Sequence, residues 1–346
     1  MLAAILAALL ILMSYGCFVT GTPRYRGPVT DHFDGRSFHN LPATPGLGFA
    51  RFLRWSWTRK PGPWLERLDA EPGPPPPKSV EGGRLRVTFV GHSTLLIQTE
   101  GLNILTDPVW SERIGPASWI GIRRRRTPGI RFEELPRIDI VLVSHNHYDH
   151  MDMPTLARLA REHSPRFFTG LGNAATLKAA GIGGASEMDW WDEAEISPGV
   201  KLAYVPARHF SSRSLCDRNR ALWGGFVIAA PAGPIYFAAD TGWGRHLANI
   251  RDRYGPPRLA ALPIGAFLPA WFMQPMHLSP GQAIEAHRLL GSRVSIPIHY
   301  GTFRLGDDGQ FEAIERLANA LVSTPDLIRD FWMPDHGEGR DVPALR

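Results

Sequence analysis

Cysteine is nearly absent from this chain of 346 residues, which has only Cys17 and Cys216. Two thiols cannot build the disulfide framework of a small secreted domain. They also cannot supply the ligands of a cysteine-based zinc site. Any metal ion must therefore be held by histidine and carboxylate side chains.

Internal repeats are absent as well: no unit of about 20 to 50 residues recurs, which argues against a solenoid. With 44% hydrophobic and 21% charged residues, the chain is long enough for one large domain or two ordinary ones with a real core. The net charge of +5 suits an anionic partner, and the densest basic run is 123–126. A lipid headgroup, a nucleic acid and a simple solvated loop are all compatible with that run.

Charged side chains are missing from the first thirteen residues, MLAAILAALLILM. This apolar run is shorter than the roughly 20 residues of a spanning helix, yet it precedes small residues and Cys17 in the manner of a targeting segment. We therefore expect residues 1–17 to be a signal or membrane-anchor segment, whether cleaved, lipidated at Cys17 or retained. The expectation that follows is a membrane-associated protein of the bacterial cell envelope.

Aromatic and proline residues are frequent in residues 18–83, which contain the proline-rich run PGPPPPK at 72–78. We expect this part to be an N-terminal extension with a semi-rigid linker. The residue pattern changes at Arg84, where two β-rich runs begin. Glu100 and Gly101 separate these runs, which predicts a hairpin. Residues 84–346 are therefore predicted to form the main domain.

Further elements of the main domain are predicted from hydrophobic periodicity and capping residues. The predicted strands are 138–144, 200–205, 222–229, 234–239, 259–263 and 294–298. The predicted helices are 153–162, 173–180, 280–290 and 311–322. Because strands precede helices in both halves, the pattern indicates an α/β domain with mixed sheets.

The most informative stretch is SHNHYDH, which directly follows an apolar strand. His145 and His147 lie two residues apart and point to the same side, while Asp149 and His150 follow as the chain turns. Zinc binds imidazole and carboxylate groups, and a reactive zinc ion keeps one coordination position open. Four ligands within six residues exceed the need of one such ion, so the spacing suggests two metal ions.

A second ion needs ligands from elsewhere, and three residues stand where a predicted strand gives way to a loop. They are His209, Asp240 and His299. Loops on a rigid scaffold are where such sites are assembled. Each of the three is therefore a candidate metal ligand.

The order HxHxDH, then His, Asp and His resembles the metallo-β-lactamase superfamily. That resemblance implies an α/β fold, the αββα sandwich of two mixed β-sheets flanked by helices, with a dinuclear metal centre at one edge of the sheets. It further implies that one ion is held by His145, His147 and His209, that the other is held by Asp149, His150 and His299, and that Asp240 bridges them.

Motifs in the same order along residues 25–305 are similar to the N-acylphosphatidylethanolamine-hydrolysing phospholipase D branch and its bacterial relatives. They are GPVTDHFDGRSFHN, VTFVGHSTLLI, LTDPVWSER, ELPRIDIVLVSHNHYDHMD, RHFSSRSLCDRNRALWGGFVI, AADTGW and IPIHYGTFRL. The resemblance implies a phosphodiester hydrolase that acts on a phospholipid through a hydroxide bridging two zinc ions. It gives catalytic roles to Asp240, Asp149 and His277. We expect His92 to hold a ligand carboxylate or a backbone carbonyl rather than a metal.

The chain departs from that branch at Leu268 and Ala270, where an acidic residue and an arginine usually stand. If those polar groups orient the headgroup, the native substrate differs. A set of aromatic residues either lines an acyl-chain groove or belongs to the core. The set is Trp110, Trp119, Trp271 and Phe272.

Other functions are compatible with the same scaffold. Hydrolysis of a lactone, an ester or a β-lactam at the same site is the alternative activity. A di-iron redox protein is disfavoured, because such members resemble HxExDH with Glu in the place of His147. A nuclease is disfavoured because the chain has too little spare length for a cap domain. We expect no nucleic-acid partner, and the resemblance suggests a homodimer.

Overall fold

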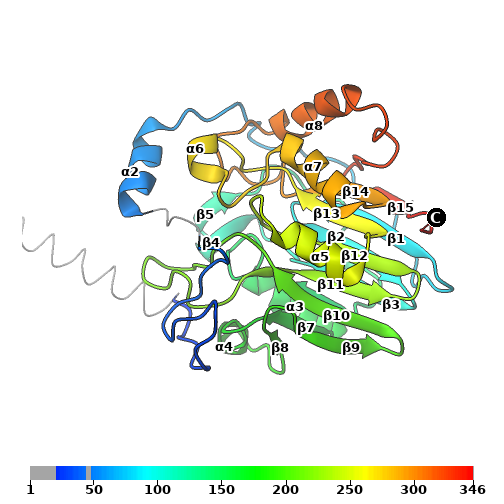
Figure 1. The fold of residues 1–346 in the computed structure, drawn as a ribbon, viewed down its shortest axis with the longest axis horizontal. Helices are drawn as coiled ribbons and strands as arrows, with labels where there is room; N and C mark the ends of the chain where they lie inside the picture. The colour runs from blue at the N-terminus through cyan, green and yellow to red at the C-terminus, as the bar shows by residue number, and fades with distance from the viewer. Residues whose placement is uncertain (1–20, 44–47, 346) are drawn as a thin grey trace, which may run out of the picture.

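The computed structural model describes residues 21–43 and 48–345. Two β-sheets pack face to face, and helices cover the outer sides of the pair (Figure 1). The strands within each sheet run both parallel and antiparallel. The predicted sandwich of mixed sheets is therefore confirmed.

The first sheet has seven strands, listed here in their order across the sheet: β15 (Gly339–Asp341), β1 (Leu85–Gly91), β2 (Thr94–Thr99), β3 (Leu102–Thr106), β6 (Ile140–Val143), β7 (Arg166–Gly170) and β8 (Ser186–Met188). Neighbouring strands from β15 to β3 are antiparallel, and those from β3 to β8 are parallel. The histidine-rich segment begins at the carboxyl end of β6, in the parallel part.

The second sheet has six strands, in the order β14 (Val294–Ile298), β13 (Leu259–Pro263), β12 (Gly233–Phe237), β11 (Gly224–Ala230), β10 (Val200–Pro206) and β9 (Glu193–Ser197). β14, β13 and β12 are parallel, whereas β12 to β9 are antiparallel. A separate hairpin consists of β4 (Arg113–Ala117) and β5 (Ile120–Arg123).

Strand β6 shows how the sandwich is built. Its side chains alternate between the two faces of the sheet. Ile140 and Leu142 join the core between the sheets, whereas Val141 and Val143 join a second cluster that includes Leu156. Because β6 is buried on both faces, it reads as a continuous apolar run, as parallel strands usually do.

The helices begin and end at residues suited to those positions. α3 (Met153–His163) has Pro154 in its first turn and ends at Ser164 in a left-handed conformation. α7 (Pro280–Leu290) begins with a capping box formed by Ser279 and Gln282. The other helices are α2 (Phe49–Thr58), α4 (Ala174–Ala179), α5 (His246–Tyr254), α6 (Ala270–Met273), α8 (Glu312–Val322) and the 3-10 helix Phe132–Glu134.

The strands and helices predicted from residue 138 onward are all present, with bounds that differ by at most two residues. The predicted hairpin is present, because β2 and β3 pair antiparallel across the turn at Glu100 and Gly101. The first predicted run is split, however, into two strands, β1 and β2. The chain turns after β1, where Gly91 has φ +137° and His92 has φ +55°. The segment at this turn, Gly-His-Ser-Thr at 91–94, interrupts the apolar pattern, and this signal was missed.

Residues 21–43 pack against the sandwich. Phe33 and Phe38 are each 1% exposed and belong to the core between the sheets. The Asn40 side-chain amide donates a hydrogen bond of 2.9 Å to the backbone carbonyl of His209. Part of the predicted N-terminal extension therefore belongs to the packed body. The domain boundary at residue 83 stays a prediction.

The predicted localisation needs correction. The apolar segment 1–17, on which the membrane anchor was predicted, lies outside the described residues. Within residues 21–43 and 48–345, no helix is long and apolar enough to cross a membrane. The prediction of a membrane-associated protein held by its N-terminal segment is therefore wrong.

Candidate metal centre

All seven predicted metal ligands lie together at one edge of the sandwich. The HxHxDH segment follows β6 of the first sheet, whereas the other three residues follow strands of the second sheet, namely β10, β12 and β14. His299 has φ +62°, a conformation that non-glycine residues rarely adopt. The two sheets thus deliver side chains to one place from segments that are far apart in the sequence.

One group consists of His145, His147, His209 and Asp240, whose candidate ligand atoms all lie within 4.8 Å of one another. His147 Nδ1 lies 2.8 Å from His145 Nε2 and 3.2 Å from His209 Nε2. The outer ring nitrogens are held elsewhere: His145 Nδ1 lies 2.9 Å from Ser144 Oγ, and His209 Nδ1 lies 3.2 Å from the Met276 carbonyl. These contacts direct both Nε2 atoms inward.

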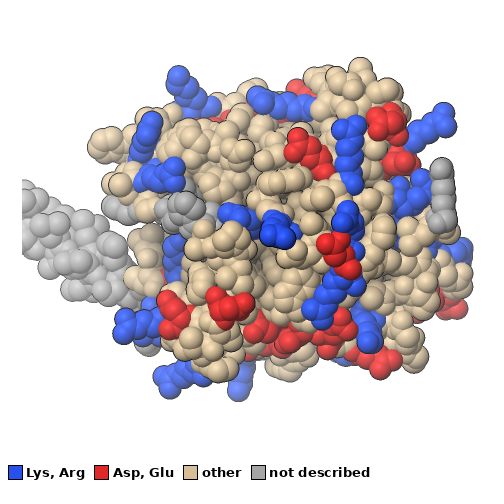
Figure 2. All heavy atoms as spheres, viewed as in Figure 1, with Lys and Arg blue, Asp and Glu red and all other residues tan. Residues whose placement is uncertain are grey.

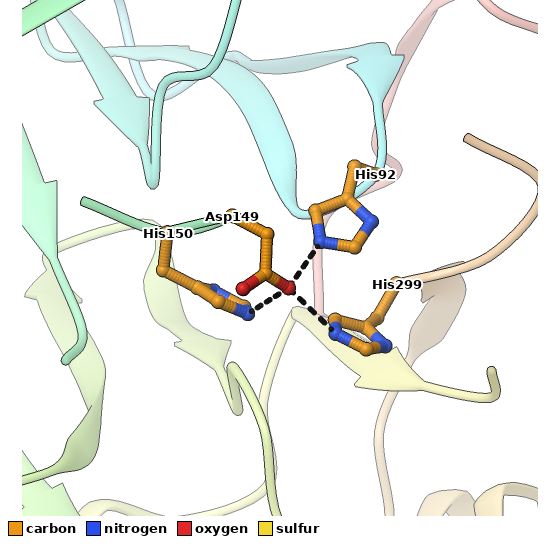
Figure 3. Close-up of side chains that lie close together, drawn as sticks. All are labelled: His92, Asp149, His150 and His299. Atoms are coloured by element: carbon orange, nitrogen blue, oxygen red, sulfur yellow. Dashed lines mark hydrogen bonds and ion pairs between the residues drawn. The ribbon is translucent and has the colours of Figure 1, made fainter. Parts of the chain in front are cut away.

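A second group surrounds the Asp149 carboxylate (Figure 3). Its Oδ2 atom lies 2.9 Å from His92 Nε2, 3.2 Å from His150 Nε2 and 3.3 Å from His299 Nε2. His92 therefore lies where it was predicted, against a candidate ligand carboxylate.

Asp240 joins the two groups. Its Oδ2 atom lies 3.5 Å from His209 Nε2 in the first group. The same atom lies 3.3 Å from His150 Nε2 and 3.2 Å from His299 Nε2 in the second. A single carboxylate oxygen thus faces both sets of imidazoles.

Asp107, which was not predicted as a site residue, supports the second group. This fully buried carboxylate follows β3, and its Oδ2 atom lies 2.7 Å from His150 Nδ1. It also accepts hydrogen bonds from the backbone N–H and the hydroxyl of Ser144, at 2.7 and 2.6 Å. Such partners fix the tautomer and orientation of a ligand imidazole. The signal in the sequence was the LTDP motif, where an aspartate ends an apolar strand.

Burial keeps the imidazoles of the first group neutral. It holds the pKa of His145 and of His209 well below the usual value, and it lowers the pKa of His147 to about 4. A neutral imidazole has a lone pair available for a metal ion. At neutral pH these three side chains are therefore in the state that metal binding requires.

The second group differs in charge. Burial alone would lower the pKa of His150 and of His299, but Asp240 and Asp149 raise both, to about 9 for His299. Burial alone would raise the pKa of Asp149 and of Asp240, but His150 and His299 hold both well below the usual range. Without a bound cation the second group therefore contains imidazolium–carboxylate pairs.

Unpartnered atoms show that this centre suits a bound cation. Asp240 Oδ1 and His277 Nδ1 are buried and lack a hydrogen-bond partner among the described residues. A buried polar atom without a partner costs roughly 1 to 3 kcal/mol. Imidazole nitrogens and carboxylate oxygens are ligands that zinc and similar divalent ions accept. The donor set therefore fits a divalent metal.

A cavity of about 490 Å³ opens onto this centre. Its lining includes five of the candidate ligands, His147, Asp149, His209, Asp240 and His299. The apolar residues of the lining, called here the apolar wall, are Phe52, Trp55, Phe210, Leu215, Phe272, Met273, Met276 and Leu305. In this wall Trp55 of α2 stacks on Phe272, with ring centroids 4.9 Å apart. Helix α2, which contributes Phe52 and Trp55 to this wall, was not predicted.

The predicted groove residues are only partly correct. Phe272 lines the cavity, but Trp110, Trp119 and Trp271 are not among its lining residues. Trp110 packs edge-on against Phe132, and Trp119 is 76% exposed beside the β4–β5 turn. The contribution of an aromatic side chain to the wall depends on the position of its helix, which the sequence does not specify.

His277 lies beside Asp240 and His299, and the candidate ligand atoms of these three residues all lie within 4.8 Å of one another. The Nδ1 atom of His277 is buried, has no hydrogen-bond partner among the described residues and lies 4.0 Å from Asp240 Oδ2. Burial lowers the pKa of His277 to about 4. Leu268 and Ala270 line a smaller neighbouring cavity of about 230 Å³, which His277 also lines.

Residues 102–300 match the family model of the beta-lactamase superfamily domain. The chain belongs to this superfamily. N-acyl-phosphatidylethanolamine-hydrolyzing phospholipase D 1 of Caenorhabditis elegans is 35% identical over 254 residues, which cover 70% of this chain and 71% of that relative. An uncharacterised protein of Mycobacterium tuberculosis is 38% identical over 245 residues, or 69% of this chain. The match spans 65% of the mycobacterial protein's own length, slightly under two thirds.

A solved structure supports the same fold. The isothiocyanate hydrolase from Delia radicum gut bacteria gives a TM-score of 0.62 at 18% identity, covering 75% of this chain and 100% of that one. At such identity the likeness concerns the fold alone. The resemblance to the superfamily and to its phospholipase D branch is confirmed by the relatives above, and the chain belongs to a family of metal-dependent hydrolases.

Proposed function

We propose that the protein is a phospholipase D-type phosphodiester hydrolase that acts on N-acylphosphatidylethanolamine-like lipids with two zinc ions. The observation that carries the proposal is the cavity, because an apolar wall and a histidine–carboxylate centre face the same space. A phospholipid has the matching division into acyl chains and a charged phosphodiester. The C. elegans relative, whose name states this activity, gives independent support.

The two groups of side chains suggest how the ions would be held. His145, His147 and His209 would hold one ion, and Asp149, His150 and His299 the other. Asp240 would contact both, since its Oδ2 atom faces both groups. Two divalent ions supply Lewis acidity at a phosphoryl oxygen and lower the pKa of a water molecule.

The remaining chemistry belongs to the chain's own residues. Hydrolysis adds water across the bond between phosphorus and the N-acylethanolamine oxygen, which yields phosphatidic acid and N-acylethanolamine. The carboxylate of Asp240 is ionised, because its pKa is held low, and can accept a hydrogen bond from the attacking water. His92 orients Asp149 by the hydrogen bond of 2.9 Å.

His277 is placed to act on the substrate. It lines the cavity and is neutral above about pH 4, because burial lowers its pKa. A neutral imidazole can donate its N–H to a phosphoryl oxygen or to the leaving oxygen. We assign this role to His277 and leave the metal-binding roles to the seven other side chains.

The test is a mass-spectrometric assay of the zinc-loaded protein on a panel of N-acylated and ordinary phospholipids. The expected result is release of phosphatidic acid, fastest from the N-acylated lipids. Release from none of them, together with turnover of lactones, esters or β-lactams, would contradict the proposal and favour the alternative activity. A zinc-loaded His277→Gln variant should bind the lipid yet hydrolyse it more slowly.

A further inference from the structure

A hollow of about 580 Å³ lies apart from the metal centre, between the β4–β5 hairpin, the chain after α2 and the turn after β14. It shares no lining residue with the cavity at the metal centre. We call it the arginine hollow, because its lining includes Arg59, Arg113, Arg123, Arg125 and Arg304. In Figure 2 basic side chains surround the region of α2, whereas acidic ones gather mainly toward the lower edge.

The fold, not a run of neighbouring residues, assembles this hollow. In the basic run 123–126, Arg124 is 2% exposed and donates to the backbone carbonyls of Val109 and Ser111. Arg126 pairs with Asp335 at 2.9 Å. Only Arg123 and Arg125 reach the hollow, where three arginines from other segments join them.

Positive charge in the hollow is poorly balanced. The single carboxylate in its lining is Glu66, 85% exposed, with Oε1 3.7 Å from the nearest Arg123 nitrogen. Arg113 and Arg125 donate to backbone carbonyls, at 3.0 and 2.8 Å, which neutralise no charge.

The other two arginines of the hollow, Arg59 and Arg304, differ in how their charge is balanced. Arg59 pairs with Asp307 at 2.9 Å, outside the lining. The Nε atom of Arg304 is buried and has no hydrogen-bond partner among the described residues. All five guanidinium groups are on half-buried side chains, so their mutual repulsion is less screened than on an open surface. An anion from solution would relieve this repulsion.

The chemistry of the hollow defines the ligand. The planar guanidinium group presents paired N–H donors that match phosphate oxygens, and arginine is common wherever phosphate is recognised. A water molecule occupies only about 30 Å³, and a phosphate group has the volume of a few water molecules. The hollow of about 580 Å³ therefore has room for more than one phosphate group. We propose that the arginine hollow is a binding site for a small anion that carries two or more phosphate groups.

The position of the hollow connects it to the cavity wall. Arg59 directly follows α2 and lies over the Trp55 ring, 4.4 Å from its centroid. Arg304 directly precedes Leu305, which lines the same wall as Trp55. An anion that contacts both arginines would hold α2 against the turn after β14. Amide hydrogen exchange in residues 50–58 should therefore slow when the anion binds, and unchanged exchange would contradict this link.

The binding test uses the zinc-loaded full chain and isothermal titration with myo-inositol hexakisphosphate as the probe. The double variant Arg123→Ala/Arg304→Ala should bind at least about tenfold more weakly than the wild type, because two charge-assisted contacts are lost. The matched control is Arg137→Ala/Arg329→Ala, which removes the same charge from two exposed arginines outside the hollow. Its affinity should fall less than about threefold.

Equal losses in the two double variants, or no loss in either, would overturn the proposal. Arg123→Glu alone guards against misfolding, since this side chain is 42% exposed and its replacement leaves the core intact. It should also weaken binding about tenfold or more. Zinc content measured after each titration must stay constant, because the probe also chelates metal ions.

A second arm distinguishes a soluble ligand from a lipid headgroup. Phosphatidylcholine vesicles with and without phosphatidylinositol bisphosphate are sedimented with the wild type and with both double variants. Binding that needs both the phosphoinositide and the hollow arginines, without binding of the soluble probe, would support the site and assign it to a headgroup. Binding of the soluble probe alone would assign it to a free phosphorylated molecule. Binding of neither would overturn the proposal.

Discussion

The two groups of the candidate metal centre, its first and second halves, both contain histidine and carboxylate side chains, but their imidazoles differ in protonation state. His145, His147 and His209 are kept neutral by burial, so no proton has to leave before they accept a cation. His150 and His299 are held protonated by the carboxylates of Asp149 and Asp240. The comparison teaches that ligand identity alone does not define a metal site, because the neighbouring carboxylates decide which half must first release protons.

The largest effect is expected at Asp240, the residue that the two halves share. Asp240→Ala removes the only described side chain whose carboxylate oxygen lies near imidazoles of both groups. Hydrolysis should fall roughly a thousandfold or more, and the zinc content of the purified protein should fall with it. Full activity and full zinc content in this variant would show that the halves do not form one centre.

The two halves should also differ in their dependence on pH. His299 has a pKa of about 9, so below that pH a proton competes with the metal ion for its Nε2 atom. Because His150 must also release its proton, the zinc affinity of the second half should rise by more than about tenfold per pH unit up to about pH 9. In the first half, His147 has a pKa of about 4, so no such rise is expected above that pH.

Competition titration with a zinc-binding dye at several pH values measures both affinities. The weaker site should strengthen as the pH rises from about 6 to 9, while the tighter site stays constant. The same pH dependence at both sites would contradict the predicted difference in protonation state between the two halves.

Asp107 offers a test of the second half alone. Asp107→Asn keeps the shape of the side chain but removes the charge that lies 2.7 Å from His150 Nδ1. Loss of a partner behind a ligand histidine typically lowers metal affinity or activity by 10 to 100-fold. We expect that loss at the second half, with the affinity of the first half nearly unchanged. An equal loss of metal affinity at both sites would contradict this prediction and indicate a general structural defect.

The smallest effect concerns the apolar wall rather than the metal centre. Trp55→Ala removes a ring that stacks on Phe272 and lines the cavity. The KM for a long-chain lipid should rise roughly tenfold, with a smaller change in kcat, because the wall binds substrate without touching the reacting atoms. Trp57→Ala on the same helix is the matched control, since Trp57 is 89% exposed. Equal effects of the two variants on KM would show that Trp55 does not bind the substrate through the cavity wall.

Much of the candidate metal centre could be predicted from the sequence because its ligands lie within a few residues of the end of an apolar strand. That position leaves a polar side chain at a sheet edge, so His145, His209, Asp240 and His299 were recognisable before the sheets were known. The order of strands and helices from residue 138 onward also predicted an α/β domain with mixed sheets. Its sandwich form was implied by the family resemblance.

The parts that escaped prediction depend on tertiary packing. Asp107 reaches His150 only because β3 and β6 are neighbours in the sheet. Helix α2 covers the cavity through Trp55 and Phe52, although nothing in its own sequence specifies where it docks. The run 123–126 reads as uniformly basic, yet successive residues on an extended chain face opposite sides, so Arg124 is buried while Arg123 and Arg125 reach the hollow.

The central claim is hydrolysis at phosphorus of a phospholipid that lies in the cavity. It is tested most directly by incubating the zinc-loaded protein with N-acylphosphatidylethanolamine in oxygen-18 water and analysing the products by mass spectrometry. The account predicts one labelled oxygen in the released phosphatidic acid and none in the N-acylethanolamine. Label in the N-acylethanolamine or in a released fatty acid would contradict it, because the attack would then have occurred at carbon.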